Sequence, residues 1–190
     1  MIRKFQDIFE SHGLKIYLKP FNIIATCPDG GLIQTVPDAI SIDKLKKSNP
    51  MFTTLKQYFV TTFKHGGSAP VKGIKTKGRP ASVSSNQAKH NKKKYAAAKN
   101  AFLQSAAGYS LLCYFLQIKD RHNENIMIDI EGHIFHIDFG FLLSNAPGKG
   151  VKFEQAPFKL NSELVEVLGG DRSQEFIEYR ELMKLGFMAL

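Results

Sequence analysis

The first residues of the chain place apolar side chains every three or four positions, which is the period of an amphipathic helix. Ile2, Phe5, Ile8 and Phe9 carry this repeat, and Gly13 follows it. Glycine commonly ends a helix because it tolerates a left-handed backbone. The sequence therefore predicts a short helix that buries one face and ends just before residue 13.

Two apolar runs of strand character come next. LKIYLKPFNIIAT and LIQTV flank the turn-forming sequence CPDGG, so residues 14–36 are predicted to form an antiparallel hairpin. Pro20 marks an edge or a bend in it. Pro37 prevents the second strand from continuing in the centre of a sheet, and the chain is expected to leave the sheet there. The later run MFTTLKQYFVTTF fits either a short helix or an irregular apolar segment.

The second half of the chain contains the longest apolar stretch, and residues 100–118 are predicted to form the main buried helix. Four polar residues interrupt it, so burial in a protein core is a better interpretation than a membrane span. Residues 125–138 predict a second hairpin that turns at DIEG. NSELVEVLGG predicts a short helix ended by a glycine pair. Residues 171–190 predict a last amphipathic helix, with Asp171 and Gln174 at capping-box spacing.

The positive charge is concentrated in one segment. The chain has 190 residues, 43% of them hydrophobic, which is enough for one domain with a core. Nine of the 26 basic residues lie between Gly66 and Lys99, where there is no acidic residue. The remaining 17 basic residues balance 17 acidic ones. Residues 66–98 are also rich in Gly, Ser, Ala and Asn, so they are predicted to be a disordered basic insert.

This insert has two interpretations. It is either a solvated insertion without a partner or a contact for anionic lipid, RNA or a regulatory protein. Tyr95 is the one aromatic residue among its cations. Surfaces that bind nucleic acid interleave aromatic and basic residues, so no nucleic-acid partner is expected.

The two cysteines, Cys27 and Cys113, lie far apart and each stands in an apolar run. Their spacing fits neither a metal site nor a redox motif. We therefore expect two buried, reduced thiols and a reducing, intracellular compartment. The N-terminal sequence is amphipathic rather than continuously apolar, so no signal peptide is expected.

The polar residues around the second hairpin point to a charged ligand. If the chain reverses at Ile130–Glu131, Asn125 and Asp138 lie side by side at the open end of the hairpin. An amide oxygen and a carboxylate are suitable ligands for Mg²⁺ or Mn²⁺, which complete their coordination with water and phosphate. Gly140 would let the chain turn away sharply after this site.

Asp120, Arg121 and His122 stand just before this pair. A carboxylate, a cation and an imidazole close to a metal ligand suit the removal of a proton from an alcohol near a phosphate. Taken singly, each polar residue has a structural explanation: Asp120 or Asn123 could cap a turn, and His136 could be a hydrogen-bonded core residue. The complete pattern, D-R-H-x-x-N followed after twelve residues by D-F-G, is poorly explained by chance.

These motifs resemble the phosphatidylinositol 3- and 4-kinase family, in which the protein-kinase order HRD is reversed to DRH and is followed by Asn and then DFG. The chain has DRHNEN and HIDFG. Its segments GYSLLCYFLQIKDRHNENIMID, GHIFHIDFGFLLSNAPG and LKPFNIIATCPDGGLIQTVPDAISI are similar to type III phosphatidylinositol 4-kinases, and APFKL favours the beta, Golgi-type branch. The resemblance covers the chain apart from the basic insert.

The resemblance implies an α+β, protein-kinase-like fold. Residues 1–40 would form the end of the N-terminal lobe and the hinge, GLIQTVPDA. Residues 41–190 would form the mainly helical C-terminal lobe. A complete kinase also has a Gly-rich loop and an N-lobe lysine, and neither occurs before Leu14, so the chain is expected to be truncated.

The family further implies ATP with Mg²⁺ or Mn²⁺ as cofactors and phosphatidylinositol in membranes as substrate. It implies a cytoplasmic protein attached peripherally to Golgi or other intracellular membranes. Small GTPases or calcium sensors would be its regulators.

Roles for the matching residues follow from the same resemblance. Asp138 would bind the metal and the ATP phosphates, with Asn125 as the second metal ligand. Asp120 and His122 would position and deprotonate the inositol hydroxyl, and His122 is the preferred base because imidazoles titrate near neutral pH. Arg121 would hold the catalytic loop in place.

Nucleotide and lipid contacts are implied as well. Lys119 would contact a phosphate of lipid or nucleotide, and the backbone of Val36 would bind adenine. The apolar walls of the adenine site would be Phe21, Ile33, Met127 and Ile137. Residues 141–160 would be the activation loop, whose basic residues are Lys149, Lys152 and Lys159. A substrate with fewer phosphates needs fewer positive charges around it. The small number of basic residues in this loop therefore agrees with a phosphatidylinositol substrate that carries no phosphate at inositol positions 4 or 5.

One position departs from the family pattern. Glu124 stands where the family has Gly, and its carboxylate could add a metal ligand or repel phosphate. Two alternatives are considered beside a phosphatidylinositol 4-kinase. One is a kinase-like binding module without catalytic activity. The other is a phosphatidylinositol 3-kinase, which shares the catalytic loop but is expected to have a more basic activation loop.

Overall fold

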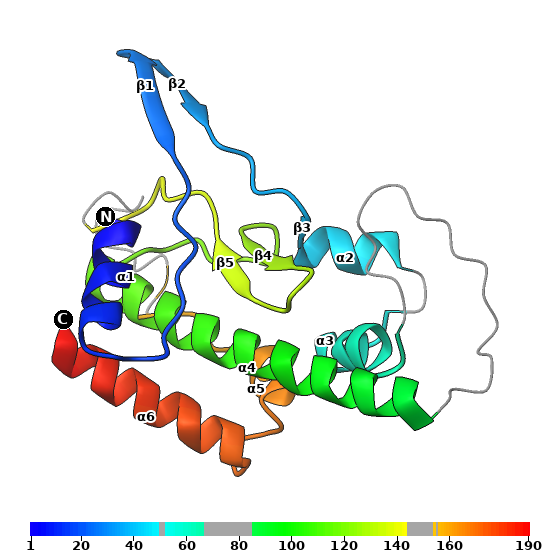
Figure 1. Ribbon diagram of the computed structural model, residues 1–190. Helices are drawn as coiled ribbons and strands as arrows, with labels where there is room; N and C mark the ends of the chain where they lie inside the picture. Colours follow the sequence, from blue (N-terminus) through cyan, green and yellow to red (C-terminus); the bar gives the residue numbers. More distant parts are fainter. Residues whose placement is uncertain (50–51, 67–84, 144–153, 155) are drawn as a thin grey trace.

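The computed structural model describes residues 1–49, 52–66, 85–143, 154 and 156–190 (Figure 1). It is a mixed α/β structure with small sheets and mostly helical content, as the α+β expectation requires. The helices and strands are α1 (Ile2–Ser11), β1 (Ile23–Cys27), β2 (Gly30–Ile33), β3 (Ala39–Ser41), α2 (Ile42–Ser48), α3 (Leu55–Phe59), the π-helix η1 (Val60–Lys64), α4 (Ser85–Leu116), β4 (Ile126–Asp129), β5 (Ile134–His136), α5 (Ser162–Val167) and α6 (Gln174–Ala189).

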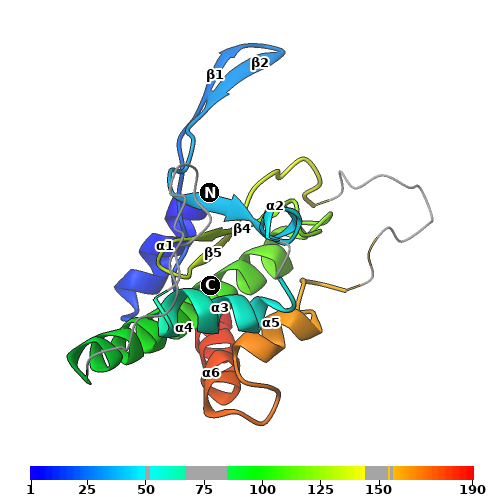
Figure 2. The ribbon, with the colours of Figure 1, turned by 90° about the vertical axis from the view of Figure 1, so that its right-hand side faces the viewer.

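The predicted first hairpin exists, but its strands begin at residue 23 rather than at residue 14. β1 and β2 form a separate two-stranded antiparallel sheet that projects from the rest of the molecule (Figure 2). The preceding residues alternate like a strand, yet Ile16 and Leu18 are buried in the core instead. Tyr17 donates its main-chain N–H to Gln104 of α4. A Cβ on Gly108 would lie 2.6 Å from the Tyr17 oxygen, so only glycine permits this approach to α4.

The second hairpin has the predicted register. β4 pairs antiparallel with β5, and Ile126 lies opposite His136. β3 adds to the other edge of β4, so β4 is the central strand of this second sheet. The chain therefore leaves the first sheet near Pro37, as expected, and immediately joins a second sheet. No sequence feature had indicated that Ala39–Ser41 would pair with a strand so far along the chain.

The basic insert is shorter than predicted. Residues 67–84 lie outside the described residues, but α4 begins at Ser85, so the second half of the supposed loop 66–98 is helical. The reason is that Asn91, Tyr95 and Ala98 follow a helical period and pack inward, where α4 contacts η1. This contact stabilises the first half of α4 as a helix, although the composition of that segment is poor in apolar residues.

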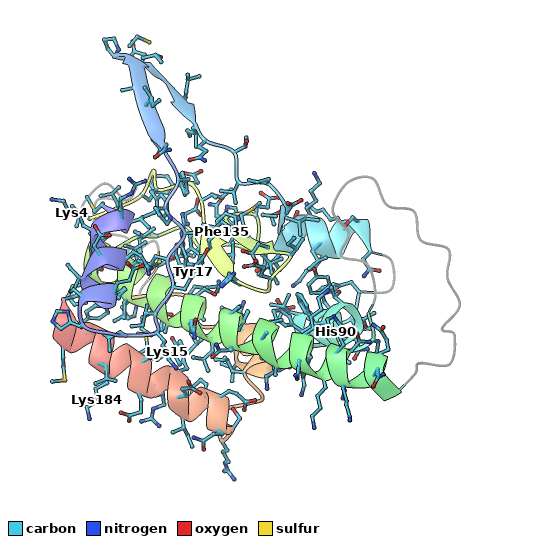
Figure 3. The ribbon with its side chains drawn as sticks, in the orientation of Figure 1. Lys4, Lys15, Tyr17, His90, Phe135 and Lys184 are labelled. Atoms are coloured by element: carbon cyan, nitrogen blue, oxygen red, sulfur yellow. The ribbon has the colours of Figure 1, made fainter. Side chains whose placement is uncertain are left out.

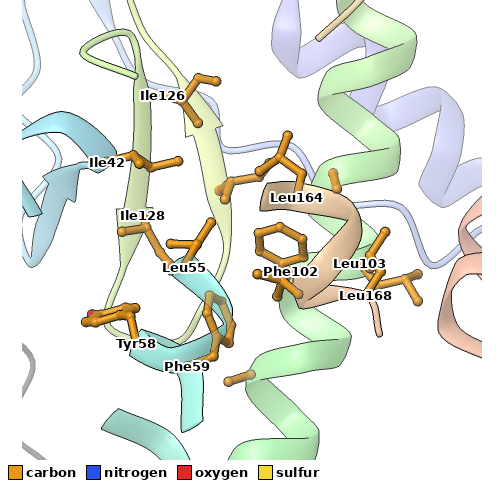
Figure 4. Packing of buried hydrophobic residues seen from close by; sticks show 14 of the residues in the cluster. Ile42, Leu55, Tyr58, Phe59, Phe102, Leu103, Ile126, Ile128, Leu164 and Leu168 are labelled. Atoms are coloured by element: carbon orange, nitrogen blue, oxygen red, sulfur yellow. The ribbon is translucent and has the colours of Figure 1, made fainter. Parts of the chain in front are cut away.

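α4 is the central element of the core, as predicted for residues 100–118. Buried side chains gather along it in two clusters. One cluster joins α4 to α2, α3, α5 and the second sheet, with Phe102 fully buried near its middle (Figure 4). The other joins α4 to α1 and to β5. α6 packs along α4 as well (Figure 1). Among the described helices, none is both long and apolar enough to cross a bilayer.

Several local expectations are resolved by the structure. α1 ends before Gly13, which has the left-handed φ of 65°, as predicted. The run after residue 51 is helical rather than irregular. α6 is capped by Ser173, which accepts from the Phe176 N–H, so the expected Asp171/Gln174 capping box is wrong.

The two cysteines differ in burial. Cys113 is buried, as predicted, but Cys27 is exposed because it lies in a hairpin whose two strands are exposed along their whole length. Sequence hydrophobicity around Cys27 was therefore a poor guide to its burial.

Candidate active site

A cleft of about 840 Å³ lies between the base of the β1–β2 hairpin and the second sheet. One wall comes from the hairpin and the segments on either side of it, and the other from β4, β5 and the residues after β5. All six residues that were predicted to surround the nucleotide line this one cleft: Phe21, Ile33, Val36, Met127, Ile137 and Asp138. Segments that are about a hundred residues apart in sequence therefore meet here.

Sequence reasoning missed other residues of the cleft, including Phe135 and Phe139. Their signal was available, because Phe135, Ile137 and Phe139 alternate and residues two apart in an extended chain share a face. Phe139 also stacks on Phe21 from the opposite wall, with ring centroids 6.3 Å apart.

Asn125 and Asp138 stand at the open end of the second hairpin. The N–H of Ile137 donates to the oxygen of Asn125 at 3.1 Å, which extends the ladder one residue beyond β4. Asp138 follows with a left-handed φ of 57°, and its exposed carboxylate accepts from the Gly140 N–H at 3.1 Å. Aspartate tolerates this backbone better than most residues because its short side chain bonds locally. The backbone pairing thus explains why the side chains of Asn125 and Asp138 are expected to lie close together.

The amide of Asn125 has a defined orientation. Its Nδ2 donates to the main-chain oxygen of Asp120 at 3.0 Å, which leaves Oδ1 as the acceptor atom. In the part of the chain that the structure describes, Oδ1 accepts no hydrogen bond. An amide oxygen and a carboxylate at the edge of the cleft form a donor set that fits Mg²⁺ or Mn²⁺.

Asp120 and His122 lie beside this donor set. Nε2 of His122 is 3.7 Å from Oδ2 of Asp120 and 3.3 Å from Nδ2 of Asn125. The His122 side chain is 48% exposed, so a substrate can reach it. Asp120, like Asp138, has a positive φ, here 64°. Non-glycine residues in this region often belong to functional sites.

The His122 ring contacts donors on both of its nitrogens. The main-chain N–H of Glu124 points at Nδ1 at 3.2 Å, and the Asn125 amide points at Nε2. A neutral imidazole has only one nitrogen that accepts, so the ring satisfies one of these contacts at a time. With the proton on Nδ1, the acceptor nitrogen is Nε2, which then faces the Asn125 amide at 3.3 Å and lies 3.7 Å from Oδ2 of Asp120.

Arg121 is almost completely buried beside the site, with 1% exposure. Its Nε donates to the Lys119 oxygen at 2.9 Å, and its terminal nitrogens donate to the main-chain oxygens of Ile137 and Asp138. It also lies over the Phe139 ring. Burial lowers the pKa of Arg121. The guanidinium therefore joins the catalytic loop to the DFG segment, and it faces main chain rather than the cleft.

The predicted lysines are placed unequally. Lys119 donates its Nζ to the Ala156 oxygen at 3.0 Å, so it holds the segment after the DFG motif. Lys159 is half-buried. Lys149 and Lys152 lie outside the described residues, and their role as lipid contacts stays a prediction.

Glu124 turns toward α2. Its carboxylate lies 3.5 Å from Nζ of Lys47, which also pairs with Asp43 at 2.7 Å. The Glu124 side chain is 61% exposed. This surface contact explains the residue without a role at the metal ligands.

His136 belongs to the core beneath the site. Burial, together with the charge of Arg121, lowers the pKa of His136 to about 3, so its ring is neutral. Burial raises the pKa of the Cys113 thiol to about 12. The thiol therefore keeps its proton and can donate it to Nδ1 of His136, 3.3 Å away. The core interpretation of His136 is consistent with this burial.

Comparison with known proteins gives a consistent result. Residues 1–189 match the family model for Phosphatidylinositol 3- and 4-kinase. A phosphatidylinositol 4-kinase of Dictyostelium discoideum is 44% identical over 188 residues, covering 99% of this chain and 14% of that protein. Phosphatidylinositol 4-kinase beta 1 of Arabidopsis thaliana is 41% identical over 192 residues, covering 99% and 15%. Phosphatidylinositol 4-kinase beta of Xenopus tropicalis is 38% identical over 189 residues, covering 100% and 20%. The chain spans a fifth or less of the length of these relatives.

Proposed function

The chain belongs to the phosphatidylinositol 3- and 4-kinase family, and from this premise we propose that it acts as the catalytic part of a phosphatidylinositol 4-kinase. The reaction would transfer the γ-phosphoryl group of ATP to the 4-hydroxyl of phosphatidylinositol. The observation that carries the proposal is one cleft that has apolar walls and includes Asp138 in its lining, with Asn125, Asp120 and His122 at the adjoining open end of the hairpin.

The apolar walls of the cleft suit adenine. Phe21 and Met127 would face the two sides of a flat base, and the main chain at Val36 would supply hydrogen bonds to its edge. The exposed Asp138 belongs to the lining of this slot, and the phosphates of a bound nucleotide would extend toward its carboxylate. Asp138 and Asn125 would hold Mg²⁺ or Mn²⁺, which neutralises phosphate charge when bound.

The proton of the inositol hydroxyl would leave to a residue of the catalytic loop. The hydroxyl oxygen forms the bond to the γ-phosphorus, the bond to the bridging oxygen of ADP breaks, and ADP keeps that electron pair. His122 would accept the proton at Nε2, and the Asp120 carboxylate nearby would stabilise the imidazolium that forms. Arg121 would keep the loop and the DFG segment in register during the transfer.

Fewer observations support the proposed contacts with the lipid. Lys119 and Lys159, with Lys149 and Lys152, would contact the headgroup through the activation loop. We further propose peripheral attachment of a cytoplasmic protein to Golgi or other intracellular membranes, with small GTPases or calcium sensors as regulators. This part of the proposal rests on the family resemblance.

A lipid kinase assay tests the proposal. The intact protein should convert phosphatidylinositol vesicles and Mg·[γ-³²P]ATP to phosphatidylinositol 4-phosphate. Asp138→Asn should reduce this activity at least about 100-fold, because it removes a charged ligand while keeping the side-chain shape. The exposed Asp171→Asn serves as the matched control and should be fully active. A 3-phosphate product would instead identify a phosphatidylinositol 3-kinase. Nucleotide binding without any product would identify a binding module.

A further inference from the structure

A half-buried ion pair connects the segments that form the two walls of the cleft. Nζ of Lys19 lies 3.2 Å from Oδ2 of Asp129. Lys19 stands two residues before Phe21, which lines one wall, and Asp129 ends β4, whose Met127 lines the other. The pair joins positions that are 110 residues apart in sequence.

Asp129 is the more deeply buried partner, with 4% exposure. Its Oδ1 accepts the N–H groups of Glu131 and His133, each at 3.0 Å. Its Oδ2 faces Lys19 and Nδ1 of His133, both at 3.2 Å. Burial alone would raise the pKa of Asp129, but its contacts with His133 and Lys19 lower it to about 2. The carboxylate is therefore charged, and the ammonium of Lys19 is its permanent countercharge.

Both ends of the β1–β2 hairpin are anchored at this same residue. On the exit side, Ala39 pairs with Asp129 in the β3–β4 ladder, and the Ile130 N–H donates to the Asp38 oxygen at 3.1 Å. On the entry side, the Lys19 side chain reaches the Asp129 carboxylate. β1 and β2 themselves are exposed along their whole length and pair only with each other. The position of the hairpin over the cleft thus depends on its two ends.

Lys19 also directly contacts one residue that lines the cleft. Its Nζ lies 5.6 Å from the ring centroid of Phe135, a lining residue. Tyr17 stacks on His133 with centroids 4.0 Å apart, which holds the same segment against the turn after β4. Tyr17 and Phe135 mark this junction in Figure 3.

A metal ion is a poor alternative explanation of this cluster. Asp129, Glu131 and His133 have donor atoms within 4.8 Å of one another. However, Oδ2 of Asp129 already pairs with the Lys19 ammonium at 3.2 Å, and this positive charge would repel a metal cation bound there. Lys19 therefore balances the negative charge of Asp129 without a metal ion.

We propose that the Lys19–Asp129 ion pair is the tether that holds the two cleft walls at a fixed separation, which makes Lys19 a positioning residue for the nucleotide. The tether follows from the structure alone, and its consequence for the nucleotide rests on the proposed function. Lys19 touches neither a phosphate nor the reacting atoms in this scheme. Its effect would pass through Phe21 and Phe135, the residues beside it on the two walls.

Hydrogen exchange and nucleotide titration test the tether. In Lys19→Met, the amides of residues 23–36 should exchange about tenfold faster without any nucleotide present. Binding of a fluorescent ATP analogue to the intact protein should weaken about fivefold or more, since small displacements of a binding wall are costly. Lys19→Arg should restore both values to within about twofold, because arginine keeps the charge.

The matched control is Lys46→Met. Lys46 pairs with Glu163 at 2.7 Å and lies 5.8 Å from the centroid of Phe52, so it has the same kind of contacts away from the cleft. It should leave exchange at residues 23–36 and nucleotide binding unchanged.

A second variant separates the tether from overall stability. In Lys19→Met with Asp129→Asn no unpaired charge remains buried, so the fold should recover while the tether stays lost. Fast exchange and weak nucleotide binding in this folded double variant would support the proposal. Exchange at the native rate would overturn it. If the tether variants exchange fast but the unaltered protein binds no nucleotide, the proposed function fails while the tether is upheld.

Discussion

The guanidinium of Arg121 donates to the main-chain oxygen of Ile137 at 2.7 Å, which ties the catalytic loop to the strand end that carries Asp138. The two residues are 16 positions apart, and the guanidinium joins their segments further because it also bonds the oxygens of Lys119 and Asp138. A planar fork of donors is needed to reach three carbonyl groups at once. The relative placement of the proposed metal ligands and the proposed proton acceptor therefore depends on a residue that need not touch substrate.

Arg121→Lys should destabilise the protein by about 2–4 kcal/mol, because a lysine keeps the charge but leaves buried carbonyl groups without donors. Urea unfolding of the two proteins measures this difference. Arg3→Lys is the control: Arg3 makes one exposed contact, with Asn22 at 3.4 Å, and the change should cost less than about 0.5 kcal/mol. Equal costs at both positions would contradict the linking role of Arg121.

His122→Gln should lower kcat for lipid phosphorylation by about 10²–10⁴-fold, the usual contribution of a general base. The KM for ATP should change less than about twofold, because the side chain lies outside the described lining of the nucleotide cleft. Steady-state kinetics with phosphatidylinositol vesicles measure both constants. A larger kcat loss in Asp120→Asn than in His122→Gln would transfer the role of base to Asp120.

Glu124→Gly introduces the residue that the family pattern has at this position. We expect kcat and the KM for ATP to change by less than about threefold, since the carboxylate faces Lys47 at the surface. The same kinetic assay over a range of Mg²⁺ concentrations provides the test. A marked shift in the Mg²⁺ requirement would show that Glu124 reaches the metal after all.

Asp129 should contribute to stability in a defined pH range. Its pKa in the folded protein is about 2, against 3.8 as the ordinary value, so the folded state binds this proton less readily than the unfolded chain. The contribution is present above pH 4 and is lost as the pH falls from about 4 to about 2, with a total of about 2 kcal/mol. Unfolding free energies of the unaltered protein and Asp129→Asn should converge over this interval. A constant difference down to pH 2 would contradict the assignment.

The register of the second hairpin could be predicted from local sequence alone. Alternating apolar residues and the DIEG turn specify the pairing of Ile126 with His136, and that register alone brings Asn125 toward Asp138. Such a pattern works because strand pairing across a tight turn involves near neighbours in sequence. The proximity of Asn125 and Asp138 therefore follows from local sequence, while their roles as metal ligands stay predictions.

Local pattern was a poor guide where a distant partner decides the outcome. Ile16 and Leu18 alternate like a strand but are buried in the core beside α4. Ser85–Ala98 has the composition of a loop but is helical, because Asn91 and Ala98 are buried on its inner face. Propensity is a weak preference that tertiary packing overrides.

The sequence by itself determined the order of the candidate catalytic residues, the two hairpins and the core helix, since each depends on residues that are close along the chain. Only the tertiary structure decided that Phe21 faces Phe139 across the cleft and that Lys19 meets Asp129. It also decided that Glu124 turns to Lys47. Contacts between segments so far apart leave no periodic signal in one sequence. They arise when burial brings the segments together and a buried charge needs a countercharge within a few ångströms.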